Sequence, residues 1–293
     1  MKPLNQIVIA TDFSKDSDTA VLLGKQLSES CGGKVTLIHV SDVTPVWDWP
    51  STEAQATQLL GHFQKEIQDA LEKKMQDQLR RCGVGYSGIV KFGNSQQVLL
   101  DFLASQSADL LVLGHRGETN LLRLGSFAQK MIAQAPIPVL VAKQNSPLRT
   151  LGCLVDPANF SAKAIDVTAS LAAQLSATKK FVSFVADLSS DALMNIPFVM
   201  PSYKFSADEK NEIIEKASAF IIERAPSIAR ADVHIEISTL PTAKALAQAL
   251  TTQHVNLAIV TRHHRGAIEK FFIGSVSKGI LEEFAGNILV LPE

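Results

Sequence analysis

Short apolar runs alternate with segments of helical periodicity along the whole chain. The first run, residues 7–10 (IVIA), is continuously apolar, which is typical of a strand buried on both faces of a sheet. In the next segment apolar residues recur at helical spacing on one face: Ala20, Leu23, Leu27 and Cys31. Gly32-Gly33 can end this helix, because glycine adopts the left-handed conformation at a helix C-terminus at little cost.

The same alternation continues to the end of the chain. In the first half we expect strands at 35–40, 86–92, 109–113 and 138–142, and helices at 53–81, at 96–105 and from residue 126. The second half repeats this order, with strands near Leu151, Phe181, Val233, Leu257 and Ile288. This alternation predicts parallel strands, right-handed crossovers and helices on both faces, so each half should be an open α/β sandwich.

Landmarks of the first half return in the second half in the same order. Phe13-Ser14 corresponds to Phe160-Ser161 at an offset of 147 residues, and Gly125-Ser126 corresponds to Gly274-Ser275 at an offset of 149. The closing apolar strands keep the offset of 149. A repeat of this length indicates a tandem duplication joined near residues 143–150, which predicts two domains, 1–146 and 147–293.

Composition excludes several classes of protein. Apolar residues make up 46% of the 293 residues, which argues against disorder. Lys plus Arg (28) nearly balance Asp plus Glu (29), which argues against nucleic-acid partners. No apolar stretch approaches the ~18 residues of a membrane span, and the N-terminal apolar run is too short for a signal peptide. The three cysteines form no C-x-x-C pair, which fits a reducing compartment. We therefore expect a cytoplasmic protein that binds neither nucleic acid nor membrane.

The segment after the predicted fourth strand, GHRGETNLLRLGS, has the features of a phosphate-binding loop. Its glycines allow close backbone approach to an anion, and a helix that begins at Ser126 would direct free N–H groups to the same place. His115 and Arg116 would add positive charge. The other interpretation is that the glycines only form a tight turn and that Ser126 only caps a helix.

Polar residues also follow the first strand. Asp12 could accept hydrogen bonds from ribose hydroxyls or help to hold a metal ion with phosphates, although an ordinary helix cap is the alternative. Val40, at the end of the second strand, could flank a purine ring or simply belong to the core. In parallel α/β sheets ligands bind at the carboxyl ends of strands where the strand order reverses, and the loops after Ala10 and Leu113 would meet there.

These residues together resemble the tandem form of the universal stress protein family. The resemblance rests on TDFS after the first strand, LIHV as the second, and Gly-x2-Gly followed by Gly-Ser after the fourth. It implies an adenine nucleotide alpha hydrolase-like fold with five parallel strands in each domain, paired through the fifth strands into an intrachain pseudo-dimer. Many members bind ATP, whereas others lack the nucleotide motif. The positions that match the binding members are Ala10, Thr11, Asp12, Val40, Leu113, Gly114, Arg116, Gly117, Gly125, Ser126 and Phe127.

The sequence departs from the family motif, Gly-x2-Gly-x9-Gly-Ser/Thr, in both halves. The first half has seven residues between Gly117 and Gly125 instead of nine. The second half keeps nine, but Thr261 and His264 replace the two leading glycines, and their side chains could block a triphosphate. Asp156 is retained and is followed by an extended loop. We therefore expect a nucleotide site in the first half and a degenerate one in the second.

No pattern of residues indicates nucleophilic or acid–base catalysis, so we expect at most slow ATP hydrolysis. The cluster 263–265 (HHR) lacks further ligands at metal spacing and is better explained as surface histidines, with anion binding by this cationic cluster as the alternative. The apolar connections at 44–50 and 191–205 could cover the crevice, form a partner surface or pack on their own domains.

Three hypotheses for function remain. The first is an ATP-binding stress-response module with its site in the first half, with or without homodimers of the tandem chain. The second is an interaction protein, a scaffold or adaptor with unidentified protein partners, that keeps the fold without the nucleotide site. The third is a second-half pocket that holds a metal ion or an apolar molecule.

Overall fold

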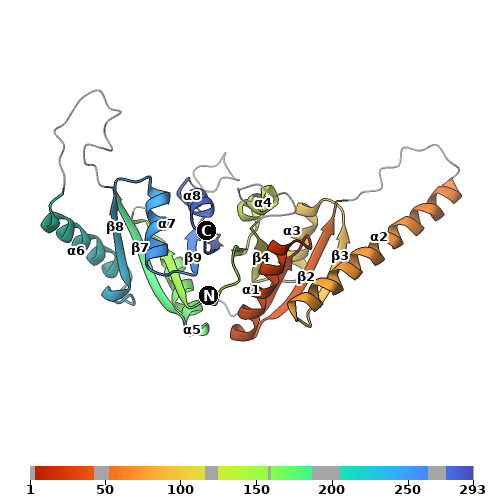
Figure 1. Ribbon diagram of the computed structural model, residues 1–293, viewed down its shortest axis with the longest axis horizontal. Helices are drawn as coiled ribbons and strands as arrows, with labels where there is room; N and C mark the ends of the chain where they lie inside the picture. The colour runs from red at the N-terminus through yellow and green to blue at the C-terminus, as the bar shows by residue number, and fades with distance from the viewer. Residues whose placement is uncertain are drawn as a thin grey trace, which may run out of the picture. The chain divides into compact units, whose positions relative to one another are not determined.

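The computed structural model describes residues 4–42, 53–115, 125–157, 160–186, 205–262 and 275–292 (Figure 1). Their contacts divide the chain into two compact units, residues 2–145 and residues 146–293. Each unit is a parallel sheet with helices on its faces. The predicted connections at 44–50 and the cluster at 263–265 lie outside the described residues, as does 191–205 except for Phe205.

The first unit contains five parallel strands in the order β3-β2-β1-β4-β5. The first strand is central, between the second and the fourth, which confirms the strand reversal that the sequence predicts. The elements are β1 (Gln6–Ala10), α1 (Lys15–Cys31), β2 (Lys34–Ser41), α2 (Glu53–Cys82), β3 (Ser87–Phe92), α3 (Ser95–Ser105), β4 (Leu110–Gly114), α4 (Ser126–Gln134) and β5 (Val139–Ala142).

The second unit repeats this topology in the order β10-β9-β6-β7-β8, again with parallel strands. The predicted α/β fold of two tandem sandwiches is therefore confirmed, while the predicted pairing of the fifth strands stays a prediction. The elements are β6 (Thr150–Leu154), α5 (Ala162–Gln174), β7 (Thr178–Ala186), α6 (Ala207–Arg224), the 3-10 helix η3 (Arg230–Asp232), β8 (Val233–Ser238), α7 (Thr242–Thr252), β9 (Leu257–Thr261), α8 (Ser275–Glu283) and β10 (Asn287–Leu291).

The apolar pattern of the sequence explains the first strand and the first helix. Ile7, Val8 and Ile9 are completely buried, as expected for a central strand covered on both faces. Helix α1 begins after Ser14, whose side chain accepts a hydrogen bond from the Ser17 N–H, and it ends at Gly32 with a φ of 74°. The predicted glycine stop is thus confirmed.

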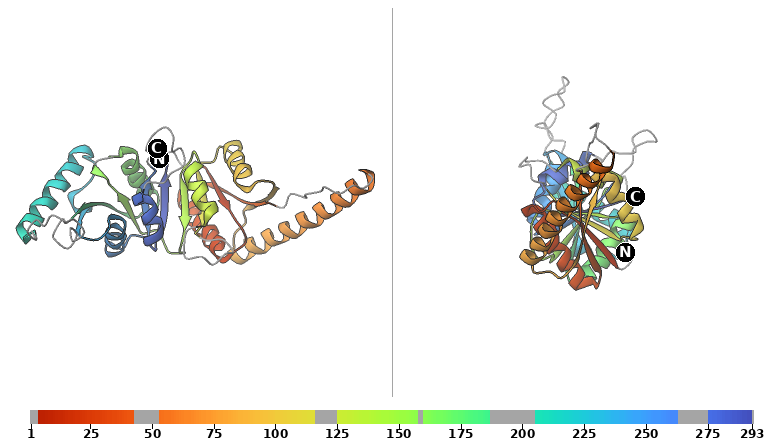
Figure 2. Two further views of the ribbon diagram at one scale, coloured as in Figure 1. Left: turned by 90° about the horizontal axis from the view of Figure 1, so that it is seen from above. Right: turned by 90° about the vertical axis from the view of Figure 1, so that its right-hand side faces the viewer.

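Helices cover both faces of the first sheet. Helices α1 and α2 pack together on one face, whereas α3 and α4 contact each other on the other face (Figure 1). Helix α2 is 30 residues long and runs past the edge of the sheet (Figure 2). Its C-terminal part is anchored by buried Met75 and Leu79, while Ile67 and Leu71 are only half-buried. Among the described residues, no helix combines the length and apolar character needed to cross a membrane.

Candidate functional site

A cavity of about 260 Å³ lies at the carboxyl ends of β1, β2 and β4 in the first unit. This is the position that the strand order predicts for a ligand. Eight of the eleven predicted site residues line it: Ala10, Thr11, Asp12, Val40, Leu113, Gly114, Gly125 and Phe127. Sequence reasoning did not select several other lining residues, namely Ser17, Ile38, His39, Asp42, Ser95, Leu99 and Ala128.

The remaining three predicted residues are placed differently. Ser126 lines an adjoining hollow together with Lys130, and this hollow shares Asp42, Ser95 and Phe127 with the main cavity. Arg116 and Gly117 belong to the segment 116–124, which is outside the described residues. The structure therefore brings together the strand ends and the start of α4.

The turn between β1 and α1 is fixed by its own backbone and by His39. The Thr11 N–H donates to the Ile38 carbonyl at 2.9 Å, and His39 Nδ1 donates to the Thr11 carbonyl at 2.8 Å. The Phe13 ring lies against the His39 ring, with their centroids 4.4 Å apart. Phe13 has a φ of 66°, a left-handed conformation that is uncommon for a residue with a side chain.

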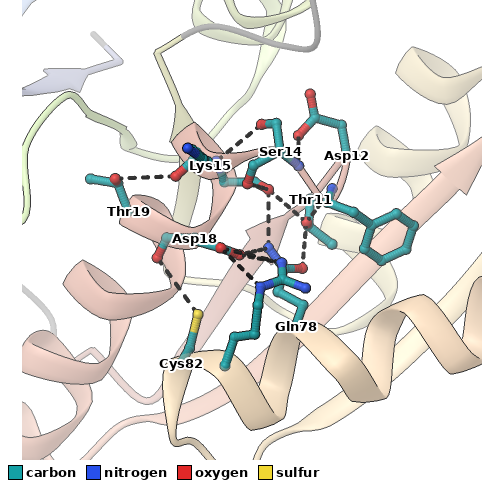
Figure 3. Close-up of polar contacts among 11 residues, drawn as sticks. Thr11, Asp12, Ser14, Lys15, Asp18, Thr19, Gln78 and Cys82 are labelled. Carbon is teal, nitrogen blue, oxygen red and sulfur yellow. Dashed lines mark hydrogen bonds and ion pairs between the residues drawn. The ribbon is translucent and has the colours of Figure 1, made fainter.

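Asp12 stabilises this turn but does not cap the helix. Its Oδ1 accepts a hydrogen bond from the Ser14 N–H at 3.0 Å, and Ser14 itself is the helix cap. The alternative interpretation of Asp12 as the cap is therefore wrong. Among the described residues none bonds to the second carboxylate oxygen, Oδ2, and the side chain points away from the neighbouring polar cluster (Figure 3). That oxygen is available to accept a hydrogen bond from a ligand.

A polar cluster, which we call the Thr11 cluster, consists of buried Thr11, Ser17 and Gln78 and half-buried Asp18 (Figure 3). The Thr11 hydroxyl donates to Gln78 Oε1 at 2.7 Å. Gln78 Nε2 in turn donates to Ser17 Oγ at 3.0 Å and to Asp18 Oδ1 at 2.7 Å. The Arg81 guanidinium forms an ion pair with Asp18 at 3.0 Å. The Thr11 hydroxyl is thus engaged within the protein.

The glycine at the end of β4 is required by the packing of α1. A Cβ atom built at Gly114 would lie 2.8 Å from the carbonyl carbon of Asp16 and 3.0 Å from the Ser17 nitrogen. Real Cβ atoms essentially never approach backbone this closely. The predicted close backbone approach exists, but the approaching group is the first turn of α1.

Helix α4 begins at the cavity without a side-chain cap. Its N-cap is Gly125, which makes no side-chain hydrogen bond, so the interpretation of Ser126 as the cap is wrong. The N–H groups of a first helical turn have no partner within the helix and carry the positive end of the helix dipole. His115, which is 8% exposed, lines the same cavity, and its carbonyl accepts from the Gly125 N–H at 3.2 Å. Anions are stabilised at such a helix start.

The second unit has a cavity of about 220 Å³ at the corresponding strand ends, lined by Asp156 among others. Strand pairing places Ser183 at the position of His39 and Phe184 at the position of Val40. Ser183 Oγ is buried and has no hydrogen-bond partner among the described residues, although the residue lines the cavity. The two cavities thus occupy equivalent places but differ in chemistry.

Thr261 ends β9 at the place where Gly114 ends β4. The second unit thus has a residue with a side chain where the first has glycine, and the Thr261 carbonyl accepts a hydrogen bond from Ser277 Oγ at 3.1 Å. The second glycine position, His264, is outside the described residues.

Among the residues that the structure describes, the Thr11 cluster has no polar counterpart in the second unit. The residues that correspond to Thr11, Ser17 and Asp18 are apolar and buried: Val155, Ala164 and Ile165. Helix α6, which corresponds to α2, buries only Ser218 and Ile221 and no amide side chain. The two units therefore differ at the positions behind the Asp12 turn, which are polar in the first unit and apolar in the second.

The described residues contain no arrangement that would act as a metal centre or a thiol nucleophile. No three His, Cys, Asp or Glu side chains gather as metal ligands would in this part of the chain. Burial raises the pKa of the Cys153 thiol to about 12 and outweighs the opposing hydrogen bond with Thr168. Burial likewise raises the pKa of the Cys82 thiol to about 11. Both thiols are protonated at neutral pH.

Comparison with known proteins places both halves in one family. The sequence pattern of the Universal stress protein family matches residues 3–143 and again residues 147–292. Universal stress protein MJ0531 of Methanocaldococcus jannaschii is 31% identical over 141 residues, which are 47% of this chain and 82% of that protein. A universal stress protein of Thermus aquaticus is 26% identical over 147 residues, which are 47% of this chain and 97% of that protein.

Solved structures agree over the whole chain. A universal stress protein from Archaeoglobus fulgidus aligns with 99% of this chain and 98% of its own, at a TM-score of 0.65 and 14% identity. A structure from Pseudomonas aeruginosa described as a putative universal stress protein also reaches a TM-score of 0.65, at 15% identity, with 99% and 94% of the two chains covered. With two family matches in tandem and the same fold, the chain belongs to the universal stress protein family.

Proposed function

We propose that the first unit binds ATP, and that the chain is a cytoplasmic, nucleotide-binding stress-response module. The observation that supports this most directly is that residues selected from sequence converge on one cavity beside the uncapped start of α4. A cavity at the strand reversal, a carboxylate on one side and a helix N-terminus on the other match the parts of an adenine nucleotide.

Each part of the ligand has a complementary part of the site. Apolar side chains that line the inner cavity would flank the adenine: Ala10, Ile38, Val40, Leu99 and Leu113. Asp12 Oδ2 would accept a hydrogen bond from a ribose hydroxyl. The start of α4 and the ammonium of Lys130 in the adjoining hollow would attract the phosphates. Mg²⁺ would arrive with the phosphates, since no described cluster of side chains holds a metal ion by itself.

The proposed role is binding rather than rapid catalysis. His39, the imidazole nearest to the Asp12 turn, donates its Nδ1 hydrogen to a backbone carbonyl and packs on Phe13. Its position serves the turn and does not leave that nitrogen to activate water. Occupancy by nucleotide would therefore act as a signal, with slow hydrolysis as the upper limit. The unpaired state of all three cysteines supports the cytoplasmic assignment.

Calorimetric titration with Mg-ATP tests the proposal, and the duplication supplies a matched control. Asp12→Asn and Asp156→Asn change the same position in the two units. We expect one site per chain, affinity about tenfold weaker in Asp12→Asn, and unchanged affinity in Asp156→Asn. If nucleotide-free protein takes up no ATP, the proposal is rejected in favour of an interaction protein that keeps the fold alone.

A further inference from the structure

Gln78 is a fully buried amide in the C-terminal part of α2, and it contacts the turn that carries Asp12. Its side chain is 0% exposed and bonds to Thr11, 67 residues earlier in the chain. We propose that Gln78 is a positioning residue, which couples helix α2 to the nucleotide site by fixing the Asp12 turn. The inference rests on the proposed ATP site, because Gln78 itself does not line the cavity.

The donors and acceptors around Gln78 allow its amide a single orientation. Asp18 Oδ1 can only accept, so the Gln78 atom 2.7 Å away is the amide nitrogen, and Oε1 must face Thr11. The Ser17 hydroxyl donates to the Ser14 carbonyl at 2.8 Å, so Ser17 Oγ accepts from Gln78. The one hydroxyl hydrogen of Thr11 is then directed to Gln78 Oε1. Ser17 Oγ, 3.0 Å from the Thr11 hydroxyl, is a second and longer acceptor for the same hydrogen.

This orientation of Thr11 determines the next turn of backbone. With its hydrogen given to Gln78, Thr11 Oγ1 presents a lone pair that accepts the Phe13 N–H at 2.9 Å. That bond holds Phe13 at its left-handed φ of 66°. Asp12 lies between the two bonded residues, so its position follows from theirs. Without Gln78, the Thr11 hydroxyl loses its shorter acceptor and keeps only Ser17 Oγ at 3.0 Å, so its hydrogen can turn away from this arrangement.

The second unit shows that the fold does not require the Thr11 cluster. There the equivalent positions are filled by Val155, Ala164 and Ile165, which are apolar and buried. The loop after Asp156 is also three residues longer before Phe160 than the loop after Asp12 is before Phe13. A longer loop has no need of the tight left-handed turn. The polar cluster therefore accompanies the short turn, and its effect is on the position of Asp12 rather than on the sheet.

Gln78 is one of two residues of α2 that contact the first turn of α1. Arg81, one turn further along α2, pairs with Asp18 of the same cluster at 3.0 Å. Two residues of one helix thus attach to the first turn of α1 beside the site. Because coupling between two sites is reciprocal, ligand at Asp12 should in turn restrict this part of α2.

Calorimetry with Gln78→Leu and hydrogen exchange at the Phe13 amide test the inference. The matched control is Gln68→Leu, since Gln68 is an exposed amide of the same helix that bonds only to Glu72 among the described residues. We expect Gln78→Leu to weaken Mg-ATP binding about tenfold and to accelerate exchange at Phe13, with both quantities unchanged in Gln68→Leu. Loss of stability alone would not produce this local pattern.

A second variant controls for a loss of folding stability in Gln78→Leu. Thr11→Val/Ser17→Ala/Asp18→Ile/Gln78→Leu copies the apolar arrangement of the second unit and adds leucine for the amide. We expect it to unfold at a urea concentration near that of the wild type, yet to bind ATP as weakly as Gln78→Leu. If it binds like the wild type, the inference is overturned.

The same experiments separate this inference from the proposed function. If the wild type does not bind ATP, the proposed site is rejected. The exchange rate of the Phe13 amide in Gln78→Leu then still shows whether Gln78 fixes the Asp12 turn. If the wild type binds ATP and Gln78→Leu shows the same affinity and the same Phe13 exchange rate, the positioning role of Gln78 is rejected and the proposed ATP site stands.

Discussion

Asp109 and Asn256 hold the same two backbone groups in the two units. Asp109 Oδ2 accepts hydrogen bonds from the N–H groups of Asn5 and Gln6, at 2.9 and 3.0 Å. Asn256 Oδ1 accepts from the N–H groups that begin the corresponding strand, both at 3.1 Å. One side chain thus ties the start of the central strand to its neighbour in each unit, and a neutral oxygen makes the same two hydrogen bonds as a charged one.

This equivalence predicts the effect of substitutions at Asp109. Asp109→Asn retains the acceptor and should change the free energy of unfolding by less than about 0.5 kcal/mol. Asp109→Ala leaves two N–H groups without that acceptor and should cost about 1–2 kcal/mol. Urea unfolding measures both variants. Equal losses in the two would show that the charge of Asp109, and not its geometry, stabilises the strand.

The contact between Gly114 and α1 predicts a steric effect. Gly114→Ala places a methyl group 2.8–3.0 Å from backbone atoms of the first turn of α1, so we expect a loss of about 1–3 kcal/mol in the free energy of unfolding. Gly85→Ala is the control, because its added methyl group meets nothing within 4 Å. Denaturant titration should show the second variant within about 0.5 kcal/mol of the wild type. A Gly114→Ala protein of wild-type stability would contradict the packing.

The buried hydroxyl of Ser183 predicts a stabilising substitution. Within the described part of the chain its Oγ has no hydrogen-bond partner, so Ser183→Ala removes a buried polar group that no described residue compensates. We expect the free energy of unfolding to rise by about 1 kcal/mol. Ser277→Ala should instead lower it by about 1 kcal/mol, because Ser277 Oγ donates to the Thr261 carbonyl. Thermal or urea unfolding measures the sign of the change in each variant. A loss of stability in Ser183→Ala as well as in Ser277→Ala would contradict the expected gain from removing the Ser183 hydroxyl.

The raised pKa of Cys153 predicts a loss of stability in alkaline solution. Burial raises this pKa from 9.0 to about 12 in the folded protein, so between these values the unfolded chain releases the proton and the folded protein keeps it. The free energy of unfolding should fall in that range by about 1.4 kcal/mol per pH unit from this group. Below pH 9 the contribution is constant.

Cys153→Ala supplies the comparison for this pH dependence. Other groups also titrate at alkaline pH, and they are common to both proteins. The difference between the two unfolding curves therefore isolates the thiol. Parallel curves above pH 9 would mean that Cys153 ionises in the folded protein.

The sheets and the place of the cavity follow from short-range features of the sequence. Apolar runs such as 7–10 mark strands buried on both faces, and a glycine pair ends α1 where the periodicity stops. The strand reversal then fixes the edge of the sheet where loops converge. These features are local, or depend on a repeat that can be counted along the chain.

The cluster behind the site was not predicted because its partners are distant in sequence. Gln78 lies on the apolar face of α2 with Met75 and Leu79, and no neighbouring residue indicates that its partner is Thr11. The sequence does not define the role of Gly114 either, because close approach of an anion and close packing of a helix both require glycine. Only the packing of α1 distinguishes them.

The apolar counterparts of the Thr11 cluster restrict how the duplicated halves can exchange parts. If α5 replaced α1, Ile165 would face the amide of Gln78, and a hydrogen-bonded pair would become an apolar contact with an unpaired polar group. If α1 replaced α5, Asp18 would bring a carboxylate into an apolar interior. An exchange between the two repeats that keeps these contacts matched would therefore have to carry the loop and both helices together.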